Sequence, residues 1–241
     1  MEKKERNRDP DDPADANCGD CWDHVAFDPE HRLVLAVVPG ARTIENTEAI
    51  VQEVSDRLRG RVPRLITTDE HDAYRSAILQ VFGAPVELPE RRGPGRPRIL
   101  PRLEAPEALT YATVCKQREG HRVVSVERKL VFGTERGLKQ ALRRSRVSTR
   151  VNTSFVERQN GTDRGRNARK ARKTYRFSKD WEVHEAMTYL SLYSSNFCWA
   201  VRTLRVKDAE DKWRQRSPAM AAKLTDHIWT WKEWFSYQAI H

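Results

Sequence analysis

The first part of the chain changes its hydrophobic period from two residues to almost four. Apolar and polar residues alternate over CWDHVAFD (21–28), and LVLAVVPG (33–40) is an almost continuous apolar run. These patterns predict two strands joined as a hairpin, the second of them buried. Apolar residues then recur every three or four positions over 44–58, which predicts a helix capped by Thr43 and closed by Gly60.

Strand and helix patterns continue through the middle of the chain, separated by turn residues. This succession predicts a mixed α/β domain. In order, the predicted elements are a short buried strand ending in an aspartate (64–69), a helix with a glycine stop (72–83), an irregular Pro-rich segment (84–108), a hairpin turning at Glu119-Gly120 (111–133), a helix (134–145) and a helix from Ser154 that carries many basic residues.

From Trp181 onward, apolar residues follow a 3.6-residue period, which predicts a long amphipathic core helix. The residues on its predicted buried face are Val183, Met187, Leu190, Tyr193, Phe197, Val201 and Leu204. The predicted organisation is a polar tail (1–17), the first part of a core (18–83), a Pro-rich loop and hairpin insertion (84–133), a helical second part (134–206) and a C-terminal tail (207–241).

The excess positive charge lies in one segment. Formal net charge is +10, and residues 143–176 hold twelve Arg and Lys against two acids, while the other 32 basic and 32 acidic residues cancel. Asn, Tyr and Phe side chains interrupt this run, which favours DNA as the partner over a merely solvated basic helix. No run of 18 apolar residues and no apolar leader is present, so we expect no membrane segment and a cytoplasmic, nucleoid-associated protein. No feature indicates a small-molecule substrate.

Two aspects of the cysteines and histidines bear on metal binding. Cys18 and Cys21 form a C-x2-C pair, but no second pair follows at zinc spacing, so a metal or redox role is disfavoured. Cys115 and Cys198 have apolar neighbours and are interpreted as core residues. Lone histidines, such as His24 and His184, are more often core or surface residues than ligands.

Asp69 is the first candidate for catalysis. It ends a predicted strand and precedes a polar turn, and active sites of open α/β sheets lie beyond the carboxyl ends of strands. A carboxylate at that place can hold a divalent metal. The alternative is an aspartate that begins the turn or caps the next helix.

Glu157 is the second candidate, and two interpretations of it stay open. Ser154 and Glu157 match a capping box, S-x-x-E. Asn160, Gly161 and Arg164 follow at spacings that share one helix face with Glu157. A carboxylate and an arginine on one face can set a metal beside a DNA phosphate, as phosphodiester chemistry with Mg²⁺ requires.

Two further segments have weaker signals. RRGPGRPR (91–98) looks like an AT-hook, in which Arg96 and Arg98 enter a narrow A·T minor groove, and the alternative is a basic Pro/Gly linker. Asp20 and Asp23 flank the first strand and are interpreted mainly as turn and surface residues.

Seven blocks of the sequence resemble transposases of the insertion-sequence-one group. They follow in order from residue 8 onward and span nearly the whole chain. The blocks are GDCWDHVAFDPEHRLV, ENTEAIV, LITTDEHDAY, NTSFVERQN, RKTYRFSKDWEVHE, SSNFCWAVRTLR and PAMAAKLTDHIWT.

This resemblance implies an RNase H-like fold with a DDE triad that uses Mg²⁺ or Mn²⁺. Asp69 and Glu157 match the second and third acids, and Arg164 matches a basic position of the family. The other residues expected to contact DNA are Arg158, Arg166, Arg169, Lys170, Arg172 and Lys173, together with Arg96 and Arg98.

The chain departs from the family at its front. The family's first aspartate lies in an Asp-Glu-x-Trp strand before the block that matches GDCWD, and no such strand precedes it here. The expectation is a core without its central strand, from a misplaced start or a truncated gene. Asp23 is then the remaining candidate for a third ligand.

Three functions compete at this stage. The first is a DNA transposase that cleaves and joins insertion-sequence ends. The second is a DNA-binding remnant without catalysis, which could inhibit a full-length enzyme by forming mixed oligomers. The third is a nuclease of the same fold that uses Asp20 or Asp23. Whether the chain forms homo-oligomers is left open.

Overall fold

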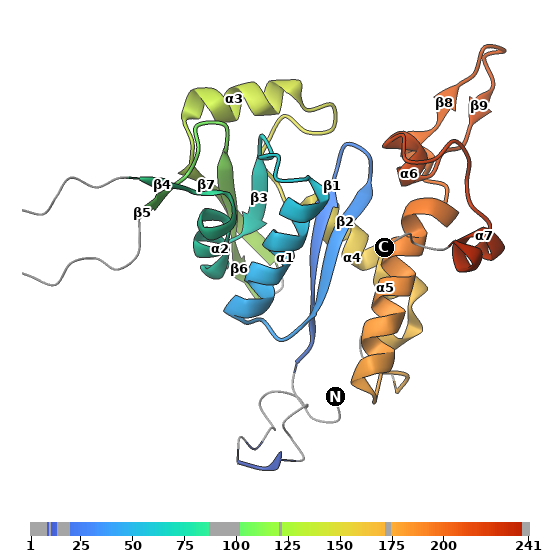
Figure 1. Cartoon of the computed structure of the whole chain (residues 1–241), viewed down its shortest axis with the longest axis horizontal. Helices are drawn as coiled ribbons and strands as arrows, with labels where there is room; N and C mark the ends of the chain where they lie inside the picture. Colours follow the sequence, from blue (N-terminus) through green and yellow to red (C-terminus); the bar gives the residue numbers. More distant parts are fainter. Residues whose placement is uncertain are drawn as a thin grey trace, which may run out of the picture. The chain divides into compact units, whose positions relative to one another are not determined.

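The computed structural model describes residues 9, 11–13, 20–86, 102–120, 122–171 and 175–237 (Figure 1). The chain is mixed α/β, as predicted, and divides into two compact units. The first unit comprises residues 1–42 and 154–241, and the second comprises 43–153. The chain therefore leaves the first unit after its hairpin and returns to it at the helix that carries Glu157. None of the helices described is long and apolar enough to cross a membrane.

The first unit is built on the predicted N-terminal hairpin. Strands β1 (Trp22–Asp28) and β2 (Leu33–Gly40) pair antiparallel, with a bulge where the register shifts between Ala26 and Phe27. Val34 and Val37 of β2 are buried against Leu192 of helix α5 (Trp181–Cys198), which runs alongside the hairpin in Figure 1. The hairpin and the burial of β2 are confirmed.

Helix α5 begins where Asp180 accepts a hydrogen bond from the backbone of Val183 at 2.9 Å. It ends at Cys198, so Val201 and Leu204 lie beyond it, and Val183 is 41% exposed. The predicted buried face was therefore only partly right, since Tyr193 packs against the core cluster and Phe197 against Trp229, but Val183 is exposed. The buried residues are His184, Thr188, Leu192, Ser194, Ser195 and Asn196, a mostly small and polar row beside the predicted apolar one.

The rest of the first unit is short elements. They are α4 (Ser154–Arg166), a 3-10 turn η3 (Ala168–Lys170), η4 (Arg202–Leu204), a hairpin of β8 (Val206–Lys207) and β9 (Trp213–Arg214), α6 (Pro218–Ala221) and α7 (Trp231–Ser236). The tail aromatics pack within the unit, because the Phe197 ring lies 4.7 Å from Trp229 and 5.7 Å from Trp234 between centroids.

The second unit holds the predicted strand, helix and hairpin patterns. Its elements are α1 (Ile44–Arg57), β3 (Ile66–Asp69), α2 (Ala73–Phe82), β4 (Ala84–Val86), β5 (Arg102–Glu104), β6 (Tyr111–Glu119), β7 (Arg122–Phe132) and α3 (Glu135–Arg144). Thr43 caps α1 and Gly83 follows α2, as predicted. The segment expected to be irregular contains the paired β4 and β5, and 87–101 lie outside the described residues.

A three-stranded sheet of order β3-β6-β7 forms the centre of this unit. Strand β3 pairs parallel to β6, and β6 pairs antiparallel to β7. One side of β6 buries Ala112 and Val114 against Val151 and against Leu138 and Leu142, of which the last two belong to α3. The prediction that β3 is buried was wrong, since its first three residues are half-buried and Asp69 is exposed at an edge strand.

Candidate nucleic-acid interface

Asp69 occupies the position that the sequence predicted, at the carboxyl end of a parallel strand. It pairs in register with Val114 of β6 and is exposed. Behind it, the Thr68 and Tyr111 hydroxyls are hydrogen-bonded at 2.8 Å. The pKa of Tyr111 is raised, mainly by burial and further by the negative charges of Asp69 and Asp72. Asp69 therefore offers a solvent-facing carboxylate at a place suited to a hard cation.

The next residue, Glu70, has a different role. Its carboxylate accepts a 2.7 Å hydrogen bond from Lys129 of β7. Hydrogen bonds from Cys115 and Lys129, in that order, lower the pKa of Glu70. The ion pair ties the turn after β3 to the sheet, and the carboxylates of Asp69 and Glu70 are both exposed at this strand end.

Glu157 lies in the first turn of α4 and is exposed. The helix begins at Ser154, and both interpretations of Glu157, as a capping residue and as a ligand, stay open. Glu157 shares a face with Arg164, whose Nη2 lies 4.0 Å from the place a Cβ would take on Gly161.

Asp69 belongs to the second unit and Glu157 to the first, so each carboxylate is described in its own unit. The same division separates the basic segment of 143–176. Arg143, Arg144, Arg146 and Arg150 belong to the second unit, and the basic residues from Arg158 onward belong to the first.

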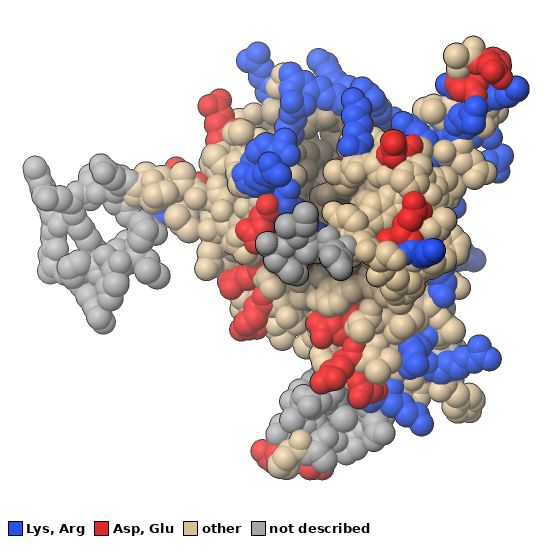
Figure 2. Space-filling model, turned by 45° about the vertical axis from the view of Figure 1, so that its right-hand side comes forward, with Lys and Arg blue, Asp and Glu red and all other residues tan. Residues whose placement is uncertain are grey.

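In the second unit, helix α3 presents a cationic outer face. Leu138 and Leu142 turn inward to the sheet, while Arg136, Lys139, Arg143 and Arg144 are exposed. Lys and Arg side chains gather at the end of the molecule where Figure 1 draws α3 (Figure 2). We call the exposed residues Arg136, Lys139, Arg143, Arg144, Arg146 and Arg150 the α3 surface.

A polar hollow of about 460 Å³ adjoins the α3 surface. Among its walls, Arg128 donates from Nε to the Val151 carbonyl at 2.7 Å, and Asn152 donates from Nδ2 to Ser148 Oγ at 2.7 Å. These hydrogen bonds hold the loop that follows α3. Three arginines line this hollow, which gives it the positive charge that suits a phosphate group, while both N–H groups of Asn152 donate within the loop. Its lining residues are Arg128, Ser145, Arg146, Val147, Ser148, Thr149, Arg150 and Asn152.

In the first unit, the predicted DNA-binding arginines lie in several environments. Arg158 and Arg169 are exposed. The guanidinium of Arg166 lies 4.1 Å from the centre of the Trp199 ring. Burial lowers the pKa of Arg166, and the negative charge of Asp163 offsets part of this shift.

A second arginine meets Arg158. Arg32 lies 4.4 Å from the centre of the Phe155 ring, and its pKa is lowered first by burial and then by the charge of Arg158. The charge of Arg158 therefore disfavours the charged form of Arg32, and an anion bound nearby would offset this repulsion.

Lys170 was expected to contact DNA, and the structure contradicts this. Its side chain is 5% exposed, and Nζ lies 2.8 Å from Asp163 Oδ2 and 3.0 Å from Asp23 Oδ2. The ammonium group of Lys170 is therefore engaged in ion pairs with two carboxylates inside the first unit. Arg96, Arg98, Arg172 and Lys173 lie outside the described residues, as does Cys18.

Asp23 was considered as a third ligand for Mg²⁺, and its surroundings do not suit that ion. Besides Lys170, its neighbours are the Cys21 thiol and the His184 imidazole, and the ligand atoms of the three residues lie within 4.8 Å of one another. Burial and the charge of Asp23 raise the pKa of Cys21 to about 11. Burial lowers the pKa of His184. Thiol and imidazole are ligands for softer metals than Mg²⁺.

Comparison with known proteins gives no match to a family model, to a curated protein or to a solved structure.

The sequence missed three features of these surfaces. The cations Arg136 and Lys139 precede the basic segment, and only the inward turn of Leu138 and Leu142 puts them on its surface. The hollow is lined both by Arg128 of β7 and by the loop that follows α3, which are distant in sequence. His184 meets Cys21 only through tertiary packing, although the i, i+2 spacing of Cys21 and Asp23 could have signalled a shared side of one strand.

Proposed function

We propose that this protein binds the DNA phosphate backbone through the α3 surface and its adjoining hollow, as a member of the DDE transposase class. The observation that carries the proposal is the α3 surface itself, six exposed cations of which Arg146 and Arg150 also line the adjoining hollow together with Arg128. Phosphate contacts of this kind supply most of the affinity of proteins for DNA.

The sheets support the class in a more limited way. Asp69 ends β3, a strand that runs parallel to β6 and is followed by a helix. Ligand-binding carboxylates of open α/β sheets occupy such positions. Strands β1-β2 and β3-β6-β7 form separate sheets among the described residues.

Asp69 and Glu157, each in its own unit, carry exposed carboxylates, the ligand type that a hard divalent cation prefers. When bound, Mg²⁺ or Mn²⁺ would supply activation of a water or 3′-hydroxyl and neutralise charge on the leaving oxygen. Asp23 does not fit as the third carboxylate, since Lys170 and the Cys21–His184 pair occupy it. Joining of labelled DNA ends by the chain with Mg²⁺ or Mn²⁺ tests the catalytic part of the proposal separately from DNA binding.

The binding test is a titration of a fluorescent 30-base-pair duplex at several KCl concentrations. The Arg143→Gln/Arg144→Gln variant should bind more weakly, and the slope of log K against log [KCl] should shrink by about 1–2, since each phosphate contact contributes roughly 0.9. Arg64→Gln/Arg75→Gln, which removes two exposed cations outside the α3 surface, is the matched control.

Equal slopes for both double variants and the wild-type protein would overturn the proposed surface. The single variant Arg164→Ala extends the test to the first unit. A smaller slope of log K against log [KCl] for this variant would indicate that α4 contacts DNA. An unchanged slope would indicate that the basic residues of this helix are only solvated.

A further inference from the structure

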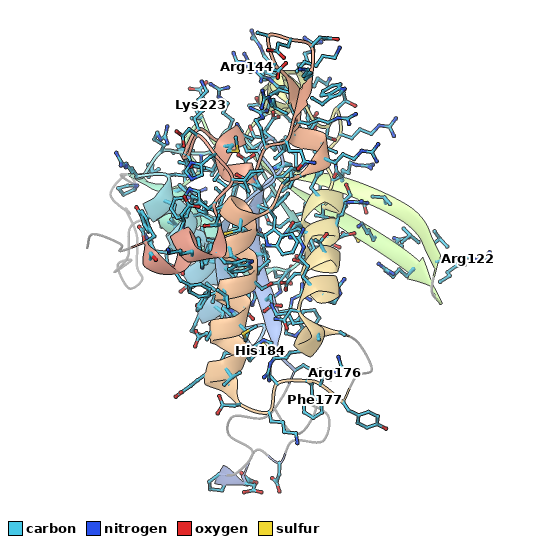
Figure 3. The ribbon with its side chains drawn as sticks, turned by 90° about the vertical axis from the view of Figure 1, so that its right-hand side faces the viewer. Arg122, Arg144, Arg176, Phe177, His184 and Lys223 are labelled. Carbon is cyan, nitrogen blue, oxygen red and sulfur yellow. The ribbon has the colours of Figure 1, made fainter. Side chains whose placement is uncertain are left out.

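The start of β1 and the first turns of α5 bring together three side chains that sequence reasoning kept apart. Cys21 and Asp23 are two positions apart and so point to the same side of the extended chain. His184 reaches them from α5, and Figure 3 labels it near the start of that helix, beside the strands of the hairpin. All three belong to the first unit.

The distances between these atoms suit a shared metal ion. Cys21 Sγ lies 3.3 Å from His184 Nε2, and His184 Nε2 lies 3.8 Å from Asp23 Oδ1. Tetrahedral zinc with bonds of about 2.0–2.3 Å separates its ligand atoms by roughly 3.3–3.6 Å. Two of the three separations therefore lie close to an edge of a zinc tetrahedron, and all three atoms lie within 4.8 Å of one another.

A buried oxygen of Asp23 supplies a second, independent observation. Asp23 Oδ1 is inaccessible to solvent and has no hydrogen-bond partner, and His184 Nε2 at 3.8 Å is too far to donate to it. An unsatisfied buried carboxylate oxygen is costly. A cation held between Oδ1, Nε2 and Sγ would satisfy it.

The groups behind the three ligands resemble the supporting shell of a metal site. The other oxygen of Asp23 forms an ion pair with Lys170 at 3.0 Å, and Lys170 also donates a hydrogen bond to Asp163 at 2.8 Å. Asp163 accepts in turn from the Ser191 hydroxyl. These linked contacts hold the Asp23 carboxylate so that Oδ1 alone faces the cluster. In known metal sites, residues that contact the ligands from behind orient them in the same way.

The charges also balance with a bound metal. Asp23, Asp163 and Lys170 leave one excess negative charge in a largely buried group. A divalent ion that displaces the Cys21 proton would bring the sum to zero. From this geometry, we propose that Cys21, Asp23 and His184 bind one Zn²⁺ ion, with a fourth coordination position left for water or an external ligand. The proposal goes beyond DNA binding and does not depend on it.

The test begins with the full chain, stripped with a chelator and titrated with Zn²⁺ and with Co²⁺. We expect one equivalent of each to bind, and Co²⁺ to give a thiolate charge-transfer band in the near ultraviolet. Cys21→Ser and His184→Gln should lose the band and at least about 100-fold in Zn²⁺ affinity. Cys198→Ser, which alters another half-buried thiol of the same unit, should bind as the wild-type protein does.

A second measurement uses only the wild-type protein, in case the variants fail to fold. Zn²⁺ should protect Cys21 from alkylation, read by mass spectrometry, and leave Cys115 and Cys198 reactive. Equal alkylation of Cys21 with and without Zn²⁺, or a cobalt band that survives Cys21→Ser, would overturn the proposal. Either result would leave the DNA titration unaffected, so the two proposals fail separately.

Discussion

The side-chain amide of Asn196 makes two hydrogen bonds with the backbone of Val34. Its Oδ1 accepts from the Val34 N–H at 2.9 Å, and its Nδ2 donates to the Val34 carbonyl at 2.9 Å. Both groups are buried, so the amide does for β2 what a neighbouring strand would otherwise do.

Asn196→Ala should therefore destabilise the protein strongly. The substitution leaves a buried N–H and a buried carbonyl without hydrogen-bond partners, which lowers the free energy of unfolding by about 2–4 kcal/mol. Urea unfolding followed by circular dichroism measures it. Gln140→Ala, on the exposed side of α3, is the control and should change stability by less than about 0.5 kcal/mol. A loss at Asn196 no larger than at Gln140 would show that the two bonds contribute little.

Lys170 and Arg169 are neighbours in sequence with opposite expected roles. Lys170→Met leaves Asp23 and Asp163 as unpaired, largely buried carboxylates, so unfolding should become easier by about 3–5 kcal/mol while the salt slope of DNA binding stays the same. Arg169→Gln, at an exposed position, should leave stability within about 0.5 kcal/mol. A stable Lys170→Met protein with a reduced salt slope would restore Lys170 as a DNA contact.

Glu157→Gln distinguishes a ligand from a helix cap. Because Glu157 is exposed in the first turn of α4 and glutamine can also serve in a capping box, the variant should keep its stability and its DNA binding. Any strand joining by the wild-type protein should be lost in the variant. A Glu157→Ala protein that loses roughly 1 kcal/mol of stability but retains joining would identify Glu157 as a cap.

The tail contains a pH-dependent contact around His227. Its Nδ1 lies 2.6 Å from Asp226 and its Nε2 lies 3.0 Å from Glu233. The Asp226 carboxylate, and then that of Glu233, raise the pKa of His227 above its ordinary value of 6.5. The Thr230 backbone and side chain, and then His227, lower the pKa of Glu233 below 4.5.

The signs of these shifts define a window. The His227 contribution is complete below pH 6.5 and is lost as pH rises through its raised pKa. The Glu233 contribution is present above pH 4.5 and is lost as pH falls through its lowered pKa. Local stability of the tail, read from Trp fluorescence during limited proteolysis, should be highest between those values. His227→Gln should remove the loss on the alkaline side, and an unchanged alkaline limb would exclude this contact as its origin.

Gly133 and Gly120 form a matched pair of left-handed glycines. Gly133 has φ +91°, and a Cβ there would lie 2.9 Å from the Leu109 carbonyl oxygen. Gly120 has φ +60° and open space around it. Gly133→Ala should cost about 1–3 kcal/mol in thermal or urea unfolding, and Gly120→Ala should cost less, because only the first combines strain with a clash. Equal losses would mean that the backbone beside Leu109 yields easily.

Much of the local structure was determined by the sequence. Thr43 and Gly60 bound α1 as predicted, and the alternating runs around residue 120 formed the β6–β7 hairpin. Caps, turns and periodicity act over a few residues, so the chain itself carries their information. The location of Asp69 at a strand end follows from the same local signals.

Tertiary structure decided which faces are buried and which side chains meet. The apolar row of α5 predicted one face, but Asn196 must reach Val34 and His184 must reach the hairpin, so the adjacent polar row turns inward. In the sequence, Lys170 is one more cation of a basic segment. In the structure, it is buried in ion pairs with Asp23 and Asp163. Burial and ion pairing depend on partners distant in sequence, such as residue 23 for residue 170, and no local pattern records such partners.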